Sequence, residues 1–117
     1  MKINEILSIL DAQLLTSFDT EGVEVFSACG ADLMSDIMAY VKENVLMLTG
    51  LVNPQVIRTA EIMDIKAVVF VRGKKPGTKI IELAEEKKII LMRTDHSMYI
   101  SCGKLYEAGL KSGGVWD

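Results

Sequence analysis

The sequence predicts an α/β fold: a small two-layer or three-layer sandwich with a mostly parallel central sheet built from consecutive βα units. The main observation is the stretch Lys66–Gly73, a short run rich in β-branched residues that ends at a charged residue and a glycine. Such a run is typical of a parallel strand buried on both faces. Similar runs lie at 45–50 and 89–94. Because parallel crossovers place helices on the faces of a sheet, three such strands predict one covered sheet.

Length and composition indicate one globular domain. The chain has 117 residues, of which 50% are hydrophobic and 25% charged. We predict a single domain over residues 1–111, followed by a flexible, turn-rich tail at 112–117. The formal net charge of -3 is unfavourable for gripping a phosphate backbone, so we expect no nucleic-acid partner.

Apolar runs and cysteines indicate the compartment. No apolar run approaches the roughly 20 residues of a spanning helix, so no membrane partner is expected. The two cysteines, Cys29 and Cys102, lie far apart in the sequence and are expected to be free thiols. We therefore predict a cytoplasmic protein.

The N-terminal part predicts a helix and a hairpin. Apolar residues with helical spacing indicate an amphipathic helix from Ile3 to about Asp11. The stretches Gln13–Thr16 and Gly22–Ser27 resemble two short strands joined by a polar turn. We expect them to form a small hairpin-like layer at one end of the domain.

The next helix, predicted over Asp32–Val41, is apolar around much of its circumference. Its two apolar stripes are Leu33, Ile37 and Tyr40, and Met34, Met38 and Val41. Ser35 and Asp36 interrupt this surface in the first turns, where the helix dipole favours a carboxylate. Two interpretations remain open, exposed polar residues or part of a functional site.

The two central βα units have matching helix openings. Asn53 is a good N-cap with Pro54 at the first helical position, and Lys75 precedes Pro76 in what we take to be the same role. Both helices are therefore expected to begin just beyond the carboxyl ends of their strands.

The last strand leads into a final helix. Thr94 and Asp95 are expected to cap this helix. It carries two stripes, one of Met98, Cys102 and Leu105 and one of Tyr99, Tyr106 and Leu110.

Known catalytic and cofactor motifs are missing from the sequence. The loop Gly73–Lys79 does not have the P-loop spacing, and no G-x-G-x-x-G follows a strand. Lysines and Arg72 near a helix start could bind an anion, but a solvated basic loop is the favoured interpretation, since charged residues are mostly just exposed. His96 beside Asp95 fits a capping neighbourhood, and one histidine with two separated thiols does not make a metal set. We expect no cofactor and no metal.

Parallel sheets place ligands at the carboxyl ends of their strands, so a binding site is expected there. Arg72 is its main candidate because a charge at the end of the central strand suits an anionic group. The expected ligand-binding residues are Ser35, Asp36, Thr49, Gly50, Arg72, Gly73, Thr94, Asp95 and His96.

Taken in order, these parts resemble the DRTGG domain family over about residues 1–110. The matching stretches are Gly30–Asp36, Leu48–Gly50, Val68–Gly73 with Pro76 soon after, and Ile90–Thr94. The resemblance implies a domain similar to the N-terminal region of HPr kinase/phosphorylase. Similar domains occur fused in some phosphotransacetylases and CBS-domain pyrophosphatases, where catalysis belongs to other domains. The stand-alone form looks like small proteins encoded near iron-hydrogenase and serine-kinase components, which implies a protein partner in a redox or phosphorylation-linked system.

Two hypotheses for function follow. The first is a non-catalytic regulatory or interaction module that self-associates and binds a small, anionic ligand. The second is a small enzyme with its site at the same strand ends. The sequence offers no activated nucleophile, acid/base pair or metal set, which favours the module. The excess of apolar helix surface, together with 7 methionines, predicts a homodimer.

Overall fold

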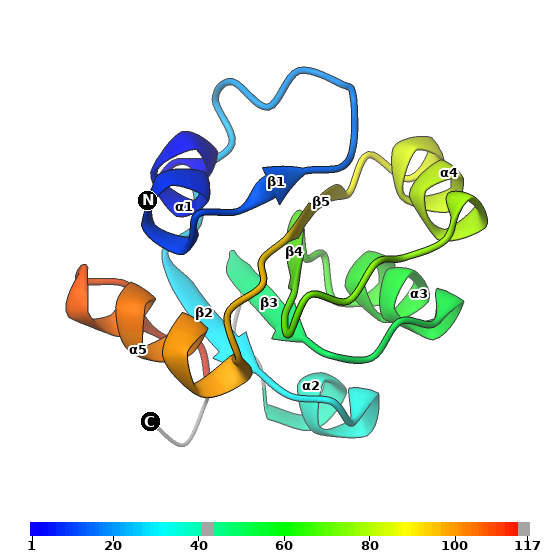
Figure 1. Cartoon of the computed structure of the whole chain (residues 1–117). Coiled ribbons are helices and arrows are strands. Elements are labelled where there is room, and N and C mark those ends of the chain that lie inside the picture. The colour runs from blue at the N-terminus through cyan, green and yellow to red at the C-terminus, as the bar shows by residue number, and fades with distance from the viewer. Residues whose placement is uncertain (41–43, 115–117) are drawn as a thin grey trace.

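The fold is an α/β sandwich around a mostly parallel sheet, as the sequence predicts (Figure 1). The computed structural model describes residues 1–40 and 44–114, without the side chain of Tyr40. Within these residues the sheet has the order β1-β5-β4-β3-β2-β6, and only β1 runs antiparallel to its neighbour. The strands are β1 (Gln13–Leu14), β2 (Ser27–Gly30), β3 (Val45–Thr49), β4 (Ala67–Phe70), β5 (Ile90–Arg93) and β6 (Lys111–Ser112).

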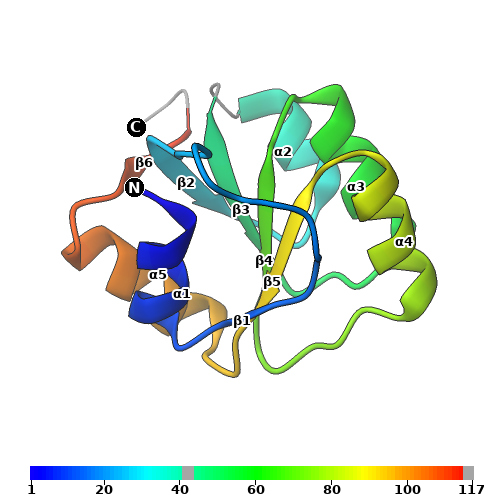
Figure 2. The ribbon, with the colours of Figure 1, turned by 90° about the horizontal axis from the view of Figure 1, so that it is seen from above.

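Helices cover both faces of the sheet, which makes three layers (Figure 2). The helices α1 and α5 lie on one face, and α2, α3 and α4 lie on the other. Their bounds are α1 (Ile3–Leu10), α2 (Met34–Tyr40), α3 (Pro54–Ile62), α4 (Thr78–Glu86) and α5 (Met98–Glu107). Since α2, α3 and α4 connect successive parallel strands on one face, the chain changes face after β5, where it enters α5.

The central strands are buried on both sides, as their apolar runs predict. Every residue of β3 and β4 is buried. Successive side chains of a strand point to opposite faces, so β4 supplies both cores. Val69 packs in the core under α1 and α5, whereas Val68 and Phe70 pack in the core under α2, α3 and α4.

One helix opening is as expected and two are corrected. Asn53 caps α3, and its side chain accepts a hydrogen bond of 2.7 Å from the Gln55 N–H. The helix α4 begins at Thr78 with Gly77 at the N-cap, because Pro76 is buried in the preceding loop instead of opening the helix. The helix α5 is capped by Ser97, not by Thr94 and Asp95.

The predicted hairpin is wrong. The strand β1 pairs antiparallel with β5 at one edge of the sheet, and Leu15 continues this edge through its N–H to the Leu91 carbonyl. The chain then crosses to the opposite side of the sheet, where Ser27–Gly30 forms β2 beside β3. In Gly22–Phe26 only Glu24 makes a β-bridge, an isolated one. The small residues of β2 do not form an apolar run, so the sequence did not predict this strand. Its position in the sheet depends on pairing with residues distant in the chain.

The start of the predicted tail belongs to the sheet. Lys111 and Ser112 form β6 beside β2, and the Gly113 N–H donates to the Ala28 carbonyl at 2.8 Å. Residues 115–117 lie outside the described part of the chain.

The apolar stripes of α2 are only partly buried. Met34 and Ile37 are buried, although we placed them on different stripes, and Leu33 and Met38 are exposed. The predicted contributions of Tyr40 and Val41 fall outside the described side chains. On α5 the predicted inner stripe is confirmed, since Leu105 is buried and Met98 and Cys102 pack against the same core. The second predicted stripe is divided. Leu110 is buried, whereas Tyr99 and Tyr106 are exposed.

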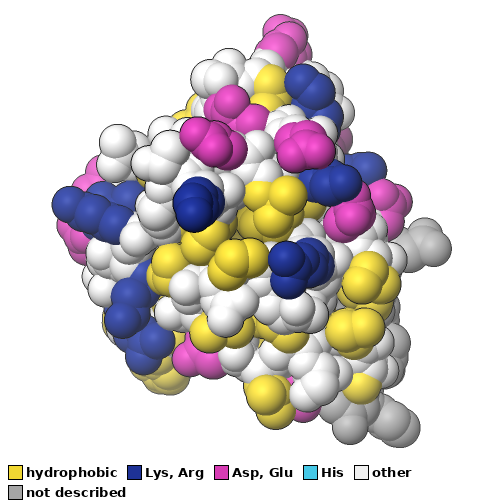
Figure 3. Space-filling view, turned by 90° about the vertical axis from the view of Figure 1, so that its right-hand side faces the viewer, with side chains coloured by type: hydrophobic (Ala, Val, Ile, Leu, Met, Phe, Trp, Pro, Cys, Tyr) yellow, Lys and Arg dark blue, Asp and Glu magenta, His cyan; other side chains and the backbone are white. Residues whose placement is uncertain are grey.

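The charged surface carries both signs on the side where α3 and α4 lie (Figure 3). Acidic, basic and hydrophobic side chains are interspersed there. Among the described residues, no helix has the length and apolar character needed to cross a membrane.

The helices α3 and α4 end in the same way. In each, the residue after the C-cap has a positive φ, Asp64 at 55° and Lys88 at 58°. The next N–H then donates back into the helix, from Ile65 to the Ala60 carbonyl and from Ile89 to the Ala84 carbonyl. This is the Schellman motif, in which glycine is usual because a side chain disfavours the left-handed conformation.

We expect Lys88→Gly to raise the free energy of unfolding by about 0.5–1 kcal/mol, because it relieves the left-handed strain at the end of α4. It also removes a cation–π contact with Phe18, which reduces the gain. Lys87→Gly is the matched control and should be destabilising, since Lys87 has an ordinary φ of -89°. Urea denaturation measures both variants. Equal destabilisation by the two glycines would contradict the strain argument.

Candidate functional site

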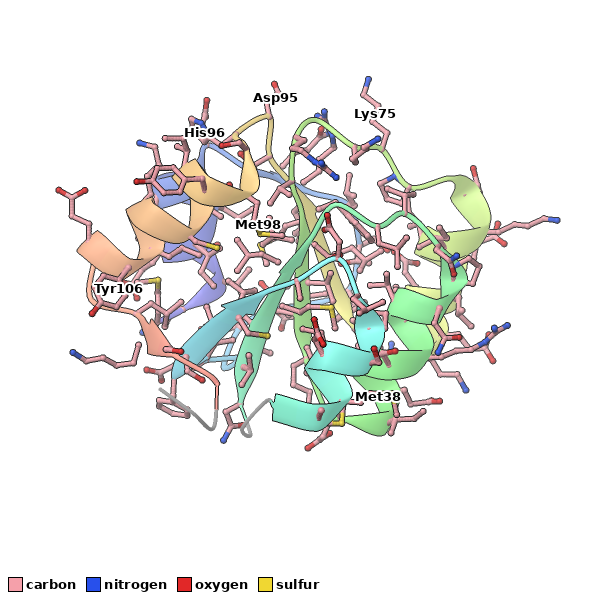
Figure 4. All side chains as sticks on the ribbon, turned by 90° about the horizontal axis from the view of Figure 1, so that it is seen from below. Met38, Lys75, Asp95, His96, Met98 and Tyr106 are labelled. Atoms are coloured by element: carbon pink, nitrogen blue, oxygen red, sulfur yellow. The ribbon has the colours of Figure 1, made fainter. Side chains whose placement is uncertain are left out.

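The carboxyl ends of the parallel strands bring four loops to one edge of the sheet. These loops follow β2, β3, β4 and β5 and lead into α2, α3, α4 and α5. Figure 4 shows Lys75, Asp95 and His96 at this edge, while Met38 lies at the opposite end of the molecule. The residues that we expected to bind a ligand come mainly from these loops.

The first group of polar residues joins the ends of β2, β3 and β4. The Asp32 carboxylate accepts a hydrogen bond of 2.7 Å from the Gly50 N–H and lies 3.5 Å from the Thr49 hydroxyl. Its other oxygen lies 3.6 Å from Nη2 of Arg72. About half of each charged side chain is exposed, 55% for Asp32 and 49% for Arg72. We call Asp32, Thr49, Gly50 and Arg72 the Arg72 cluster.

The Arg72 guanidinium lies against the backbone of Gly50, so a side chain at this position would displace it. A Cβ atom at this position would overlap the guanidinium group of Arg72, which lies directly over the Gly50 backbone. Arg72 itself has a φ of 60°, a conformation that is unusual for a residue with a side chain. Its N–H donates to the His96 carbonyl at 2.7 Å. The backbone of Arg72 is thus tied to the loop after β5, while its guanidinium lies beside Asp32 with about half of the side chain exposed.

A second group lies between the ends of β4 and β5. Nη2 of Arg93 donates to the Gly73 carbonyl at 3.2 Å and to Asp95 at 3.0 Å. Nη1 lies 3.4 Å from the Gln13 side chain. The Arg93 side chain is only 16% exposed, and its buried Nε has no hydrogen-bond partner in the described part of the chain. Asp95 is 88% exposed, so this arginine is far more buried than the acid beside it.

This second group lies where the connections between strands and helices change from one face of the sheet to the other. The loop after β4 leads to α4 on one face, and the loop after β5 leads to α5 on the other. Such switch points are where open α/β sheets usually bind ligands. Here the two loops are bridged by backbone hydrogen bonds from Arg72 to His96 and from Gly73 to Thr94. Because these hydrogen bonds close the space between the two loops, a ligand could reach this point only from the solvent side of the loops.

The structure brings most of the expected residues to this edge, but their side chains differ in direction. Thr49 and Thr94 are buried. The Thr94 hydroxyl donates to the Leu10 carbonyl at 2.7 Å and accepts from the His96 N–H, so it ties the end of α1 to β5. Ser35 and Asp36 are exposed on α2 and have no recorded contact with the Arg72 cluster. Their role in ligand binding stays a prediction.

Sequence reasoning missed Asp32 and Arg93. Asp32 stands between the end of β2 and the start of α2, so it reaches the strand ends from the place where we expected Ser35 and Asp36. Arg93 ends an apolar strand, as Arg72 follows one, and that shared pattern was the available signal. Asp32 could not be paired with Arg72 from the sequence, nor Arg93 with the Gly73 carbonyl, because these partners follow different strands.

The thiols lack the character of nucleophiles. Burial, with a smaller effect from Cys102, raises the pKa of Cys29 to about 12, and burial also raises the pKa of Cys102. Both thiols therefore remain protonated at neutral pH. Because a thiol reacts as its thiolate, neither is a good nucleophile. In residues 1–40 and 44–114 no three His, Cys, Asp or Glu side chains gather as metal ligands.

A large groove lies elsewhere, beside α5. It has a volume of about 1070 Å³ and is bounded by α5 on one side and by β2 and β6 on the other. Its lining includes Cys29, Met98, Cys102, Tyr106 and Leu110. The groove is mainly apolar and does not include the Arg72 cluster.

Comparisons with known proteins agree with this fold. Residues 5–107 match the family described as DRTGG domain. No curated protein matches the chain. A solved structure of the CBS and DRTGG domains of the regulatory region of Clostridium perfringens pyrophosphatase, complexed with its activator diadenosine tetraphosphate, is 19% identical with a TM-score of 0.74. The match covers 97% of this chain and 48% of that one, so this chain spans about half its length. Similarity to HPr kinase/phosphorylase stays a prediction.

We expect Thr94→Val to lower the free energy of unfolding by about 1–3 kcal/mol, because it leaves the Leu10 carbonyl without its buried donor. Thr59→Val is the matched control. The Thr59 hydroxyl is equally buried but has no hydrogen-bond partner among the described residues, so its loss should be neutral or stabilising. Urea denaturation of both variants gives the comparison. A larger loss in Thr59→Val would show that the Thr94 hydrogen bonds contribute little.

Proposed function

Because the chain belongs to the DRTGG domain family, we propose that it is a non-catalytic regulatory module that binds a small, phosphate-bearing anion at the carboxyl ends of its parallel strands. The observation that carries this proposal is the Arg72 guanidinium, which lies over Gly50 with half of its side chain exposed. Arginine binds phosphate and carboxylate groups through two parallel N–H donors.

The structural neighbour supports the choice of ligand class. The C. perfringens regulatory region is complexed with diadenosine tetraphosphate, an activator with several phosphate groups. We propose that the present chain responds to an anion of the same class, with Arg72 as its main contact. We propose that Thr94, Asp95 and His96 adjoin the site and that Ser35 and Asp36 approach it from α2.

The lack of catalytic activity is supported by the site chemistry. The cysteine thiols have raised pKa values, and the polar groups of the Arg72 cluster are bonded to one another. The only histidine, His96, lies beside the exposed carboxylate of Asp95 and next to Ser97, which caps α5. None of these arrangements resembles a nucleophile with its base. The alternative, a small enzyme at the same strand ends, therefore receives no specific support.

We also propose that the module forms a homodimer and acts in the cytoplasm on a protein partner in a redox or phosphorylation-linked system. Exposed apolar residues on α5 and α2 support self-association. The two cysteines are free, which suits a reducing compartment.

We expect Arg72→Gly to weaken binding of diadenosine tetraphosphate about 10-fold to 100-fold. A hydrogen bond to a charged group contributes about 1.5–3 kcal/mol, and each 1.4 kcal/mol corresponds to about a factor of ten. Glycine is chosen because the φ of 60° suits it, so the loop keeps its conformation. Isothermal titration calorimetry at fixed ionic strength measures the affinity.

Arg58→Ala is the matched control for this titration. Arg58 is an exposed cation on α3, outside the strand-end loops, so its loss should leave the affinity within a factor of two. Equal losses in the two variants would indicate nonspecific attraction by surface charge. Unchanged affinity in Arg72→Gly would place the anion elsewhere, and no binding by the parent chain would contradict the proposed ligand class.

We further expect the purified chain not to hydrolyse ATP or transfer its phosphate, because neither a P-loop nor a set of metal-binding carboxylates is present among the described residues. A coupled phosphate-release assay with Mg²⁺ measures turnover. Activity that persists at constant specific value through two further purification steps, and that falls in Arg72→Gly, would favour the enzyme alternative.

A further inference from the structure

Arg93 is a largely buried cation at the end of β5, and the proposed contact of a ligand with Arg72 leaves it without a role. Its side chain is 16% exposed, and its guanidinium donates to the Gly73 carbonyl and to the Asp95 carboxylate. The contact with the Gln13 side chain is longer, 3.4 Å. The buried Nε has no hydrogen-bond partner in the part of the chain that the structure describes. Burying a charge with an unpaired donor is destabilising, so packing alone gives little reason for an arginine here.

Asp95 is a loosely held partner for this arginine. Thr94 points into the core, so Arg93 and Asp95 on either side of it lie together on the opposite side of the chain. Only one oxygen of the carboxylate, Oδ1, contacts the guanidinium, at 3.0 Å from Nη2. Asp95 is 88% exposed and projects from the edge of the sheet in Figure 4. An ion pair with so exposed a member contributes little to stability, so the carboxylate can leave the arginine at small cost.

The surroundings of this ion pair suit an anionic group of a ligand. Arginine pairs best with phosphate and carboxylate groups through two parallel N–H donors, whereas Asp95 uses one donor. Gly73 keeps the space over the pair clear. A Cβ atom there would lie 3.2 Å from Oδ1 of Asp95 and 3.9 Å from Nη2 of Arg93. An anion can therefore take the place of the Asp95 carboxylate without movement of the loop after β4.

We propose that Arg93 is a second anion contact of the strand-end site, that Asp95 occupies it while no ligand is bound, and that a phosphate group of the ligand binds by displacing the Asp95 carboxylate. This inference rests on the proposed anion-binding function and adds an internal competitor to it. The Arg72 guanidinium lies over Gly50 at the end of β3, and Arg93 ends β5 on the other side of β4. Neighbouring strands are about 4.8 Å apart, which places the two arginines about 10 Å apart, within reach of an anion with several phosphate groups.

A purely structural role for Arg93 makes a different prediction. In that role the guanidinium only fastens the loop after β4 through the Gly73 carbonyl. This bond uses one donor and does not involve Asp95. A change at Asp95 would then leave anion binding as it is, whereas an internal competitor must weaken the binding of every anion that uses Arg93.

The test is isothermal titration calorimetry with inorganic tripolyphosphate at fixed ionic strength, on the parent chain and on Asp95→Asn. Asparagine has nearly the size of aspartate but no charge, so Asp95→Asn should bind about 5-fold more tightly. That gain corresponds to a guanidinium that Asp95 occupies in about four of five molecules. Glu82→Gln is the control for a lost surface charge. Glu82 is exposed on α4 and takes part in none of the ion pairs recorded among the described residues, so its loss should change the affinity by less than a factor of two.

Two further measurements show whether the gain acts through Arg93. In an Arg93→Gln background Asp95→Asn should give no gain, because the competitor and the ligand have lost the same partner. Circular dichroism checks that Arg93→Gln is folded. In the parent chain, which needs no variant, the Nε–H signal of Arg93 in a ¹H–¹⁵N spectrum should shift with tripolyphosphate, while that of the exposed Arg58 on α3 should not.

Unchanged or weaker binding by Asp95→Asn would overturn the displacement, as would an equal gain in Glu82→Gln or an Arg93 signal that does not shift. Arg72→Gly separates this inference from the proposed function. Weaker binding by Arg72→Gly with no effect of Asp95→Asn would leave the proposed function standing and refute the internal competitor. Tighter binding by Asp95→Asn with no effect of Arg72→Gly would support the competitor and remove Arg72 as the main contact. No binding by the parent chain or any variant would contradict both.

Discussion

Burial of both faces of the central strands is the constraint on which the other features depend. With β3 and β4 enclosed on both sides, charged groups can stand only beyond the strand ends, and helices must cover each face. The chain therefore needs one connection that changes face, and this is the loop from β5 to α5. That loop meets the one after β4 through backbone hydrogen bonds from Arg72 and Gly73, which brings Arg72 and Arg93 to the same edge.

The Arg72 cluster is joined to the start of α5 by one short segment. The carbonyl of His96 accepts the N–H of Arg72 at 2.7 Å, and one residue later Ser97 caps α5. The helix α5 begins at Met98, directly after that cap.

The βα units were predictable because each depends on neighbouring residues. The apolar runs of β3, β4 and β5 and the Asn53 cap before Pro54 are local signals, and all four were identified correctly. The false hairpin shows the limit of this reasoning. Two short polar-flanked stretches suggest mutual pairing, yet β1 pairs with β5 at the far edge of the sheet because that edge offers an unpaired partner strand.

By itself the sequence determined the fold class and the buried strands, since periodicity is a property of neighbouring residues. It also singled out Arg72 as a candidate, because the position of a charge after an apolar run is visible in the sequence, and its role in binding stays a prediction. The tertiary structure alone decided the partners. Asp32, not Ser35 or Asp36, meets Arg72, and the Thr94 hydroxyl reaches a carbonyl 84 residues away at Leu10. Such relations arise from strand order and helix placement, which are set by packing between residues distant in the chain.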